Sequence, residues 1–528
     1  MRMLLPRWLA LACFLLPCVA LRGGLAEAQN VVPPEGLPGE EWVPTDPIPP
    51  GNERRQPNTP GQPVPPPAQP ATPPNPPSTA ELLDYGRAFD RLGDDMPDGA
   101  GVAIGIVEGD PGSYGPDPDH PALRGLPLTL HSGPSDPSSH AINVLQTLAG
   151  RRGLVGKPKA VGAWSVQHWM STGYLQLGSP RPPRLAPDLG PDTPRVWSHS
   201  WISPDAERAV PVLRRIDFAI DTDGLVMCVG VNNGKQSAIP PMLGSGYNVI
   251  SVGADDGDSS GGFTRIEVDG RSKPDVVAPG GMTSFATPAV AGVAALLIDY
   301  AEGLHADDAA LSERAVRPEV VKAVIMAGAQ KHHRWAPPPG RSLDERLGAG
   351  RVNLDASLRI MQGGPIEVGE RITRGKAWAY AKLKPRGTHR YTLEIPRTLG
   401  EFSAVLTWHR RIAGRPLLLE NQSTGQRRAL WHHEPRLADL DLRLLRIDER
   451  GATISEYLLS ASRIDNVEHL FVPELPAGRY ALEVFRDAAA DPIKQEPWTY
   501  ALAWRLEPPM ANPPAAPAAP PDRDDAGP

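Results

Sequence analysis

The sequence predicts an α/β domain built on a parallel sheet, followed by an all-β sandwich. The first observation is a series of continuous apolar runs that alternate with helical patterns; the runs lie at residues 102–107, 160–164, 225–229 and 249–252. Strands that are apolar throughout are typical of a parallel sheet covered on both faces. The second observation is a change near Gly363 to short alternating segments separated by turns, which is typical of sheet packed on sheet.

The same patterns give the expected elements and the domain limits. Apolar residues with helical spacing predict helices at residues 80–92, 140–148, 212–219, 284–300 and 319–327. Alternating segments predict strands at residues 377–383, 391–395, 403–408, 437–447, 469–472, 480–485 and 500–504. We therefore predict an α/β domain at residues 79–362 and a β-sandwich at residues 363–507.

Length and charge limit the kinds of function. The chain has 528 residues, which is enough for two or three domains. It carries 54 Lys and Arg against 61 Asp and Glu, for a net charge of -7. No basic excess is present to bind nucleic acid or an anionic membrane, so neither is predicted as a partner.

Both ends of the chain have compositions that do not build a core. Residues 1–28 resemble a secretory signal, with Arg2 and Arg7, an apolar stretch at 8–21 and an Ala-Glu-Ala cleavage site at 26–28. The apolar stretch is shorter than the roughly 20 residues of a membrane span. We expect a secreted, periplasmic or cell-surface protein with no integral membrane segment after signal removal. The Pro-rich residues 29–78 and the Pro/Ala-rich residues 508–528 are expected to be disordered.

Ser284 stands at the start of a run made almost entirely of small and apolar residues. That run is too poor in charge to lie on a surface and predicts a buried helix. Because Pro288 is tolerated only near the first turn, the helix should begin close to Ser284. The positive end of a buried helix suits a nucleophile and its developing anion. The alternative is a small residue that begins a core helix.

The stretch Thr-Ser-Phe-Ala-Thr-Pro at residues 283–288, followed by Val-Ala-Gly at 290–292, resembles the nucleophile motif of the subtilisin-like serine proteases. The resemblance implies a Ser-His-acid triad in the chain order acid, histidine, serine. It differs at Met282, where the family usually has glycine. The acidic segments at 439–442 and 465–468, followed by 476–480, resemble the jelly-roll domains found after many secreted catalytic domains of this family.

His140 stands where the resemblance places the catalytic histidine. It follows Ser138 and Ser139, which are good N-cap residues, and opens an amphipathic helix. Family members usually have a Gly-Thr-His-Val-Ala-Gly-like segment there, and Ser-His-Ala-Ile at residues 139–142 takes its place. The alternative is a capping histidine on a surface helix.

The triad acid is expected at the carboxyl end of the first strand, where parallel sheets place functional groups. Glu108 directly ends the apolar run, at the place where the family has aspartate. A glutamate can take the orienting role. Asp110 is the fallback, and a solvated Glu108 without function is the alternative.

Asn232 is the predicted oxyanion donor. The segment Val-Asn-Asn-Gly at residues 231–234 follows an apolar strand and resembles the Ala-Gly-Asn-x-Gly segment of the family. Matching on the final glycine assigns the role to Asn232, while Asn233 stays open. A turn-forming Asn-Asn-Gly without catalytic function is the alternative.

The sequence thus predicts a secreted serine endopeptidase that hydrolyses protein or peptide substrates through Ser284, His140, Glu108 and Asn232. The rival is a catalytically inactive fold used as a binding module. In a third reading, the β-sandwich binds protein or glycan. No cofactor is predicted. Four acidic residues could gather around a structural calcium ion, although exposed acidic turns are favoured; they are Asp439, Asp441, Asp465 and Glu468.

Overall fold

The computed structural model describes residues 78–507, apart from residues 110, 111, 152, 172–174, 176–191, 399, 421–426, 487–492 and 494. The predicted signal at 1–28, the Pro-rich residues 29–77, the tail at 508–528 and Asp110 lie outside the described residues. The described residues belong to one compact unit.

A seven-stranded sheet organises the first half of this unit. Its strands are β1 (Ala103–Glu108), β2 (Leu128–Leu130), β3 (Ala160–Ser165), β4 (Val196–His199), β5 (Val226–Gly230), β6 (Ile250–Ala254) and β9 (Val276–Ala278). The order is β2-β3-β1-β4-β5-β6-β9, and all neighbouring pairs are parallel. A short antiparallel pair, β7 (Gly262–Phe263) and β8 (Ser272–Lys273), lies outside it. The predicted parallel sheet is confirmed.

The strand order reverses at β1. The chain passes from β1 to β2 and β3 on one side and then crosses to β4 on the other. In open parallel sheets, a crevice forms outside the carboxyl ends of the strands at such a switch point. Glu108 is the last residue of β1 and therefore lies at this crevice.

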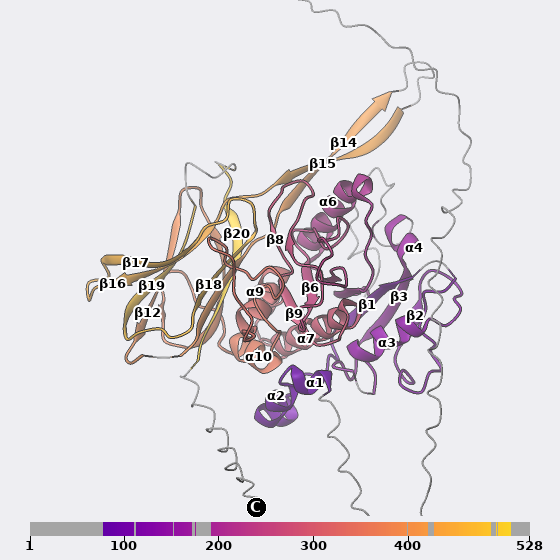
Figure 1. Cartoon of the computed structure of the whole chain (residues 1–528), viewed down its shortest axis with the longest axis horizontal. Coiled ribbons are helices and arrows are strands. Elements are labelled where there is room, and N and C mark those ends of the chain that lie inside the picture. The colour runs from indigo at the N-terminus through magenta and orange to yellow at the C-terminus, as the bar shows by residue number, and fades with distance from the viewer. Residues whose placement is uncertain are drawn as a thin grey trace, which may run out of the picture. The chain divides into compact units, whose positions relative to one another are not determined.

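Helices cover both faces of the sheet (Figure 1). They are α1 (Thr79–Leu82), α2 (Tyr85–Leu92), α3 (Ser139–Leu148), α4 (Val166–Ser171), α6 (Ala206–Asp223), α7 (Thr283–Leu304), α8 (Ala309–Ala315), α9 (Pro318–Gly328) and α10 (Leu354–Gln362), with a 3-10 turn at Gly93–Asp95. Ile104 and Cys228 face a core with α3 and α7, while Val107 and Met227 face a second core with α6. Residues of one strand thus pack into two separate cores, because successive side chains of a strand point to opposite faces of the sheet.

The central helix α7 is a core helix. Among the described residues, it alone is long and apolar enough to cross a membrane by length and composition. In the structure, 78% of its most apolar window is buried inside the protein. Its composition is therefore explained by packing between the sheet, α3 and α10.

The second half of the unit holds two antiparallel sheets. One is ordered β10-β12-β19-β16-β17, the other β11-β20-β13-β18, and β14 and β15 form a separate hairpin. The strands are β10 (Arg371–Ile372), β11 (Lys376–Leu383), β12 (Thr388–Ile395), β13 (Phe402–Thr407), β14 (Arg411–Glu420), β15 (Arg427–Arg436), β16 (Asp441–Ile447), β17 (Thr453–Ser460), β18 (Val467–Val472), β19 (Gly478–Phe485) and β20 (Trp498–Leu506). This arrangement fits the predicted β-sandwich.

The four-stranded sheet is buried on both faces. Ala404 and Leu406 of β13 point into the sandwich core, whereas Val405 between them joins the core around α7 and α9. The Thr407 hydroxyl donates to the Glu319 carbonyl of α9 at 2.8 Å. This face of the sandwich therefore continues the core of the α/β half.

The helix predicted at residues 80–92 is divided into α1 and α2. Asp84 between them has a left-handed backbone with φ of 59°. The Asn353 amide donates to its carboxylate at 2.6 Å, and the Leu354 N–H donates to the Leu83 carbonyl at 2.9 Å. Docking onto the start of α10 thus overrides the helical periodicity, which carries no information about that contact.

Candidate active site

The structure brings Glu108 and His140 together. Glu108 ends the central strand, and its side chain is 3% exposed. His140 lies in the first turn of α3, held by the Ser138 hydroxyl, which accepts from the Ala141 N–H at 3.2 Å. His140 Nδ1 lies 2.7 Å from Glu108 Oε2. A carboxylate at Nδ1 keeps the proton on that nitrogen and leaves Nε2 as the basic atom.

Both members of the pair have shifted pKa values. Burial raises the pKa of the Glu108 carboxyl, and the opposing hydrogen bond to His140 limits the rise. The hydrogen bond to Glu108 raises the pKa of His140 above its ordinary value, against partial burial of the ring. The His140 side chain is 41% exposed, so the imidazole is open to a substrate.

Ser284 is the second residue of α7, and the next residue, Phe285, lies beside His140. The rings of His140 and Phe285 lie against each other, with centroids 5.9 Å apart. The Ser200 hydroxyl donates to the Ser284 carbonyl at 2.9 Å, which fixes the start of α7 against the segment after β4. No hydrogen bond to the Ser284 hydroxyl is present among the described residues, so it remains available to a base.

The first amides of α7 differ in their hydrogen bonding. The Phe285 and Ala286 N–H groups donate to the Met282 carbonyl at 3.0 and 3.1 Å. The Thr283 N–H donates to the Asn233 side chain at 2.9 Å. Within the part of the chain that the structure describes, the Ser284 N–H has no acceptor. It can therefore donate to an anion at the helix start.

Met282, which departs from the family pattern, fits this turn without backbone strain. Its φ and ψ are −137° and 151°, an extended conformation that any residue adopts. Its side chain is 42% exposed. The special backbone freedom of glycine is used one residue earlier, at Gly281, with φ of 67°.

The two candidate oxyanion residues have different partners. The Asn232 backbone is held by Ser260, with 2.9 Å from its N–H to the serine Oγ and 2.7 Å from the serine N–H to its carbonyl. Its side-chain amide has no hydrogen-bond partner in the described chain. The Asn233 side-chain oxygen accepts from the Thr283 N–H and hydroxyl. The Asn233 side-chain nitrogen also has no acceptor in the described chain, so both asparagines stay candidates for the donor.

A second histidine close to the site has no basic role. His199, the last residue of β4, packs between Trp169 and Trp201, and the Trp201 indole donates to its Nδ1 at 3.3 Å. Burial lowers the pKa of His199 to about 3. The ring of His199 therefore stays neutral, and it packs with Trp169 and Trp201 beside the segment that includes Ser200.

The acidic residues considered for calcium are not exposed turns. Asp439, Asp441 and Glu468 are buried, which contradicts that expectation. The Glu468 carboxylate accepts from the Ser460 hydroxyl and, at 2.6 Å, from the Ser462 N–H. Burial raises its pKa well above the ordinary value. Glu468 lies in β18, whose sheet is buried on both faces, and this position explains the burial of its side chain.

Elsewhere in the described chain, Asp221, Glu319 and His409 place possible metal-ligating atoms within 4.8 Å of one another. His409 Nδ1 lies 3.0 Å from Asp221 and 3.4 Å from Glu319. Arg317 lies 3.4 Å from the other Glu319 oxygen and already supplies a positive charge there. The arrangement therefore fits a polar network that joins α6 and α9 to the sandwich.

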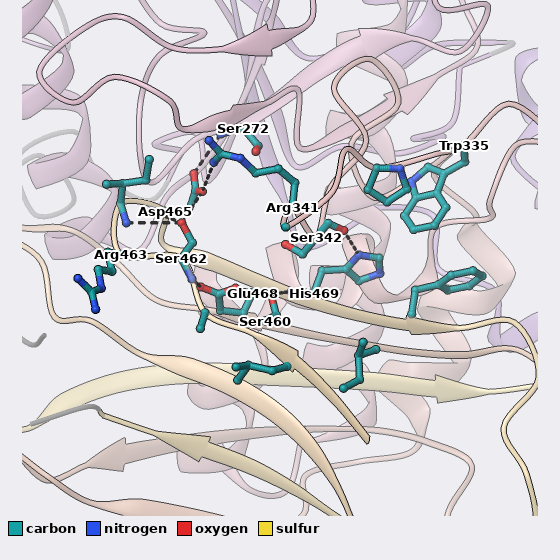
Figure 2. Close-up of a pocket in the computed structure, with 17 residues that line it drawn as sticks. Ser272, Trp335, Arg341, Ser342, Ser460, Ser462, Arg463, Asp465, Glu468 and His469 are labelled. Atoms are coloured by element: carbon teal, nitrogen blue, oxygen red, sulfur yellow. Dashed lines mark hydrogen bonds and ion pairs between the residues drawn. The ribbon is translucent and has the colours of Figure 1, made fainter. Parts of the chain in front are cut away.

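A cavity of about 620 Å³ lies between the loop at residues 335–342 and the segment at residues 458–471 (Figure 2). Two of its polar residues, His469 and Asp465, are bonded within the wall. His469 Nδ1 lies 2.8 Å from the Ser342 carbonyl, and Asp465 accepts from the Ser272 N–H at 3.1 Å and the Ser462 hydroxyl at 2.8 Å. None of the triad candidates lines this cavity.

Comparison with known proteins bears on the part of the chain that holds Asn232 and Ser284. Residues 171–350 match the subtilase (peptidase S8) family model. The match includes Asn232 and Ser284, whereas Glu108 and His140 precede it. It supports a subtilase-like serine peptidase. No curated protein matches the chain.

Several solved structures are also similar to the chain. The prenylagaramide maturation protease PagA is 18% identical, covers 52% of this chain and 99% of its own, and has a TM-score of 0.37. The PatG macrocyclase in complex with peptide is 16% identical, with 53% and 97% covered and a TM-score of 0.37. MycP1 from Mycobacterium smegmatis is 17% identical, with 52% and 83% covered and a TM-score of 0.30.

Sequence reasoning missed two contacts of the site. One joins Ser200 to the Ser284 carbonyl, and the other joins Asn233 to Thr283. Both cross 50 or more positions of sequence, so no local pattern contains them. The only available signal was the repeated asparagine after β5.

Proposed function

We propose that the chain is a serine endopeptidase. The observation that carries the proposal is the 2.7 Å contact between His140 Nδ1 and Glu108 Oε2, beside the start of the helix that bears Ser284. A buried carboxylate, a partly exposed imidazole and an unpaired serine hydroxyl are the parts that acyl transfer needs.

In the proposed reaction, Ser284 Oγ attacks the peptide carbonyl as His140 Nε2 takes the hydroxyl proton. Glu108 orients His140 and stabilises the imidazolium that forms. The tetrahedral intermediate then collapses, the C–N bond breaks, and His140 returns the proton to the leaving amine. Water then attacks the acyl-enzyme while His140 takes one of its protons, and His140 returns that proton to Ser284 Oγ as the acyl C–O bond breaks and the acid product leaves.

The negative charge of the tetrahedral intermediate needs donors that are free before the substrate arrives. The Ser284 N–H and the Asn232 side-chain amide are proposed for this role, because neither has an acceptor among the described residues. Donors fixed before reaction stabilise the developing charge without reorganisation. The chemistry requires no metal or cofactor.

We further propose that the enzyme acts outside the cytoplasm on protein or peptide substrates, on the basis of the signal-like residues 1–28 and the subtilase match. The C-terminal sheets pack on α9 and are remote from Ser284 in sequence. We expect them to bind protein or glycan.

Hydrolysis of a denatured, fluorophore-labelled protein tests the proposal. The wild-type chain should cleave it, and Ser284→Ala should lose about 10⁶-fold in turnover, as in other triads. Ser312→Ala on α8 is the matched control and should cleave at the wild-type rate. If folded wild type and Ser284→Ala are equally inactive, the chain is the inactive binding module instead.

A further inference from the structure

The cavity of about 620 Å³ beside β18 has two chemically different ends. Trp335 lies at one end and Arg463 at the other (Figure 2). The Trp335 and Phe471 rings meet edge to face, with centroids 4.9 Å apart, and Pro337 also lines the cavity. The Trp335 indole donates to the Gly348 carbonyl at 2.9 Å, which fixes the ring. One end is therefore an aromatic surface that is set before any ligand binds.

The other end carries a positive charge that the wall does not use. Arg463 is exposed, and its guanidinium has no ion-pair or hydrogen-bond partner among the described residues. Arg341 also lines the cavity, but it donates to the Gly270 carbonyl at 2.8 Å and lies 3.9 Å from the Asp465 carboxylate. Burial raises the pKa of the Asp465 and Glu468 carboxyls, which reduces their negative charge. The exposed Arg463 therefore favours a ligand that carries negative charge.

These two ends fit a peptide in which prolines are followed by acidic residues. Proline-rich peptides bind aromatic-lined grooves, because the rings pack on the prolines and the extended chain loses little entropy. Carboxylates pair with guanidinium groups through charge-assisted hydrogen bonds. Residues 508–528 of this chain have that composition: seven prolines lie within residues 508–521, and Asp522, Asp524 and Asp525 follow them. The stretch at residues 56–77 is also proline-rich, but it contains no charged residue.

The strand that precedes this segment ends close to the aromatic end of the cavity. Leu506, the last residue of β20, and Val472, the last residue of β18, pair with the same residue of β13 from opposite sides. Leu506 thus lies two strand spacings, about 10 Å, from Val472, which follows Phe471. From Phe471 to Arg463 the chain spans at most about 28 Å. Residues 508–522 span about 45 Å at about 3.1 Å per residue, so the aspartates can reach Arg463.

We propose that this cavity is a binding site for a proline-rich acidic peptide, and that its occupant is the chain's own segment at residues 508–528. In this arrangement the prolines pack on Trp335 and Phe471, and the aspartates pair with Arg463. The order of the two chemistries along the segment matches their order along the cavity. None of the triad candidates lines the cavity, so the inference does not depend on the proposed function.

A fluorophore-labelled peptide of residues 508–528 tests the site and its occupant by fluorescence anisotropy. It should bind a chain that ends at Glu507, which keeps every described residue. It should bind the full chain at least about tenfold more weakly, because the attached segment competes at high effective concentration. The uncharged peptide of residues 56–77 is the control and should bind the shorter chain about tenfold more weakly. No binding of the 508–528 peptide, equal binding to both chains or equal binding of both peptides overturns the proposal.

Charge variants locate the contact, and one of them needs no truncation. In the shorter chain, Arg463→Glu should weaken binding of the peptide by about tenfold. Arg450→Glu makes the same change at the exposed turn before β17 and should leave binding unchanged. In the full chain, Asp524→Asn with Asp525→Asn should speed hydrogen exchange of residues 458–466 by about threefold or more, because the bound segment protects this loop. Equal weakening in the two arginine variants, or unchanged exchange in the full chain, overturns the pairing with Arg463.

Discussion

At the residue scale, the most specific prediction concerns the role of Glu108 as the partner of His140. Its carboxylate is buried and bonded to His140, so an amide of the same shape should leave the ring without its anionic partner. Glu108→Gln should lower turnover by about 10⁴-fold, the loss seen when a triad acid becomes an amide. Asp110→Asn, which changes the other candidate acid, should cost little. Steady-state hydrolysis of the same substrate checks the ranking, and the reverse order would reassign the role.

The His140 pKa gives a pH dependence with a definite sign. The neutral ring is the base, so activity should fall as pH drops through a midpoint above the ordinary histidine value of about 6.5. Glu108→Gln should move the midpoint down, because the raising partner is lost. The rate of fluorophosphonate labelling at Ser284, measured across pH, gives the midpoints of the wild type and of Glu108→Gln. Equal midpoints in the two proteins would contradict the pairing of Glu108 with His140. The same shift affects stability with the opposite sign. The raised pKa of His140 stabilises the folded chain at pH values below the unfolded-state pKa, and this stabilisation is lost as pH rises through the folded-state pKa.

Asn232 should act on turnover rather than binding. Asn232→Ala removes a donor that meets the substrate only when negative charge develops. Turnover should fall by about 10²–10³-fold with the Michaelis constant nearly unchanged. Full kinetics on one peptide substrate separate the two constants. A loss confined to the Michaelis constant would assign Asn232 to substrate binding.

At the element scale, a buried charge cluster holds β9 to α9. Asp275 lies 2.9 Å from Lys273 Nζ and 3.2 Å from Lys322 Nζ. Burial opposes ionisation of Asp275, yet the two ammonium groups and the Ser251 N–H lower its pKa to about 2. The Lys-Pro-Asp segment at residues 273–275 is thus a structural anchor.

Removing the Asp275 carboxylate should leave the buried ammonium groups of Lys273 and Lys322 without their anionic partner. Asp275→Ala should lower the free energy of unfolding by about 3–5 kcal/mol, as for other broken buried pairs. Urea unfolding measures the change. Lys157→Gln, which breaks the exposed pair with Asp98, is the control and should leave the midpoint nearly unchanged. Equal shifts in the two variants would show that burial of the pair is unimportant.

Elements with strong local patterns were the ones that sequence could predict. The apolar runs of β1 and β5 and the charge-free run of α7 fix their own burial, so they lie within one to four residues of the predicted limits. The hairpin of β14 and β15 was missed, because the Leu-Leu-Leu run at 417–419 does not alternate. The site itself was predictable where a motif is contiguous, as at Ser284, and not where it depends on contacts such as Asn233 to Thr283.

At the scale of the whole molecule, the two halves share one core. Sandwich residues join the cluster around α7 and α9; they are Trp378, Val405, Val467, Ala501 and Ala503. Buried polar contacts also cross between the halves, as where Arg410 Nε donates to Asp217 at 2.6 Å. The composition change near Gly363 marks where the fold class changes, whereas the core continues across it.

The shared core predicts cooperative unfolding. The full chain should show one transition that coincides by tryptophan fluorescence and circular dichroism. A chain ending at Met361 should melt at a lower temperature, because it exposes the apolar face of α9 that β13 and β20 cover. An unchanged melting temperature after truncation would show that the halves are stable separately.

The central claim is that Ser284 is a nucleophile activated by His140. The most direct measurement is the reaction of the full, folded chain with a fluorophosphonate, followed by peptide mapping of the adduct. The wild type should carry one adduct at Ser284, while Ser284→Ala and His140→Ala should carry none there. A folded wild type that stays unmodified at Ser284, while a known serine protease reacts under the same conditions, would contradict the account.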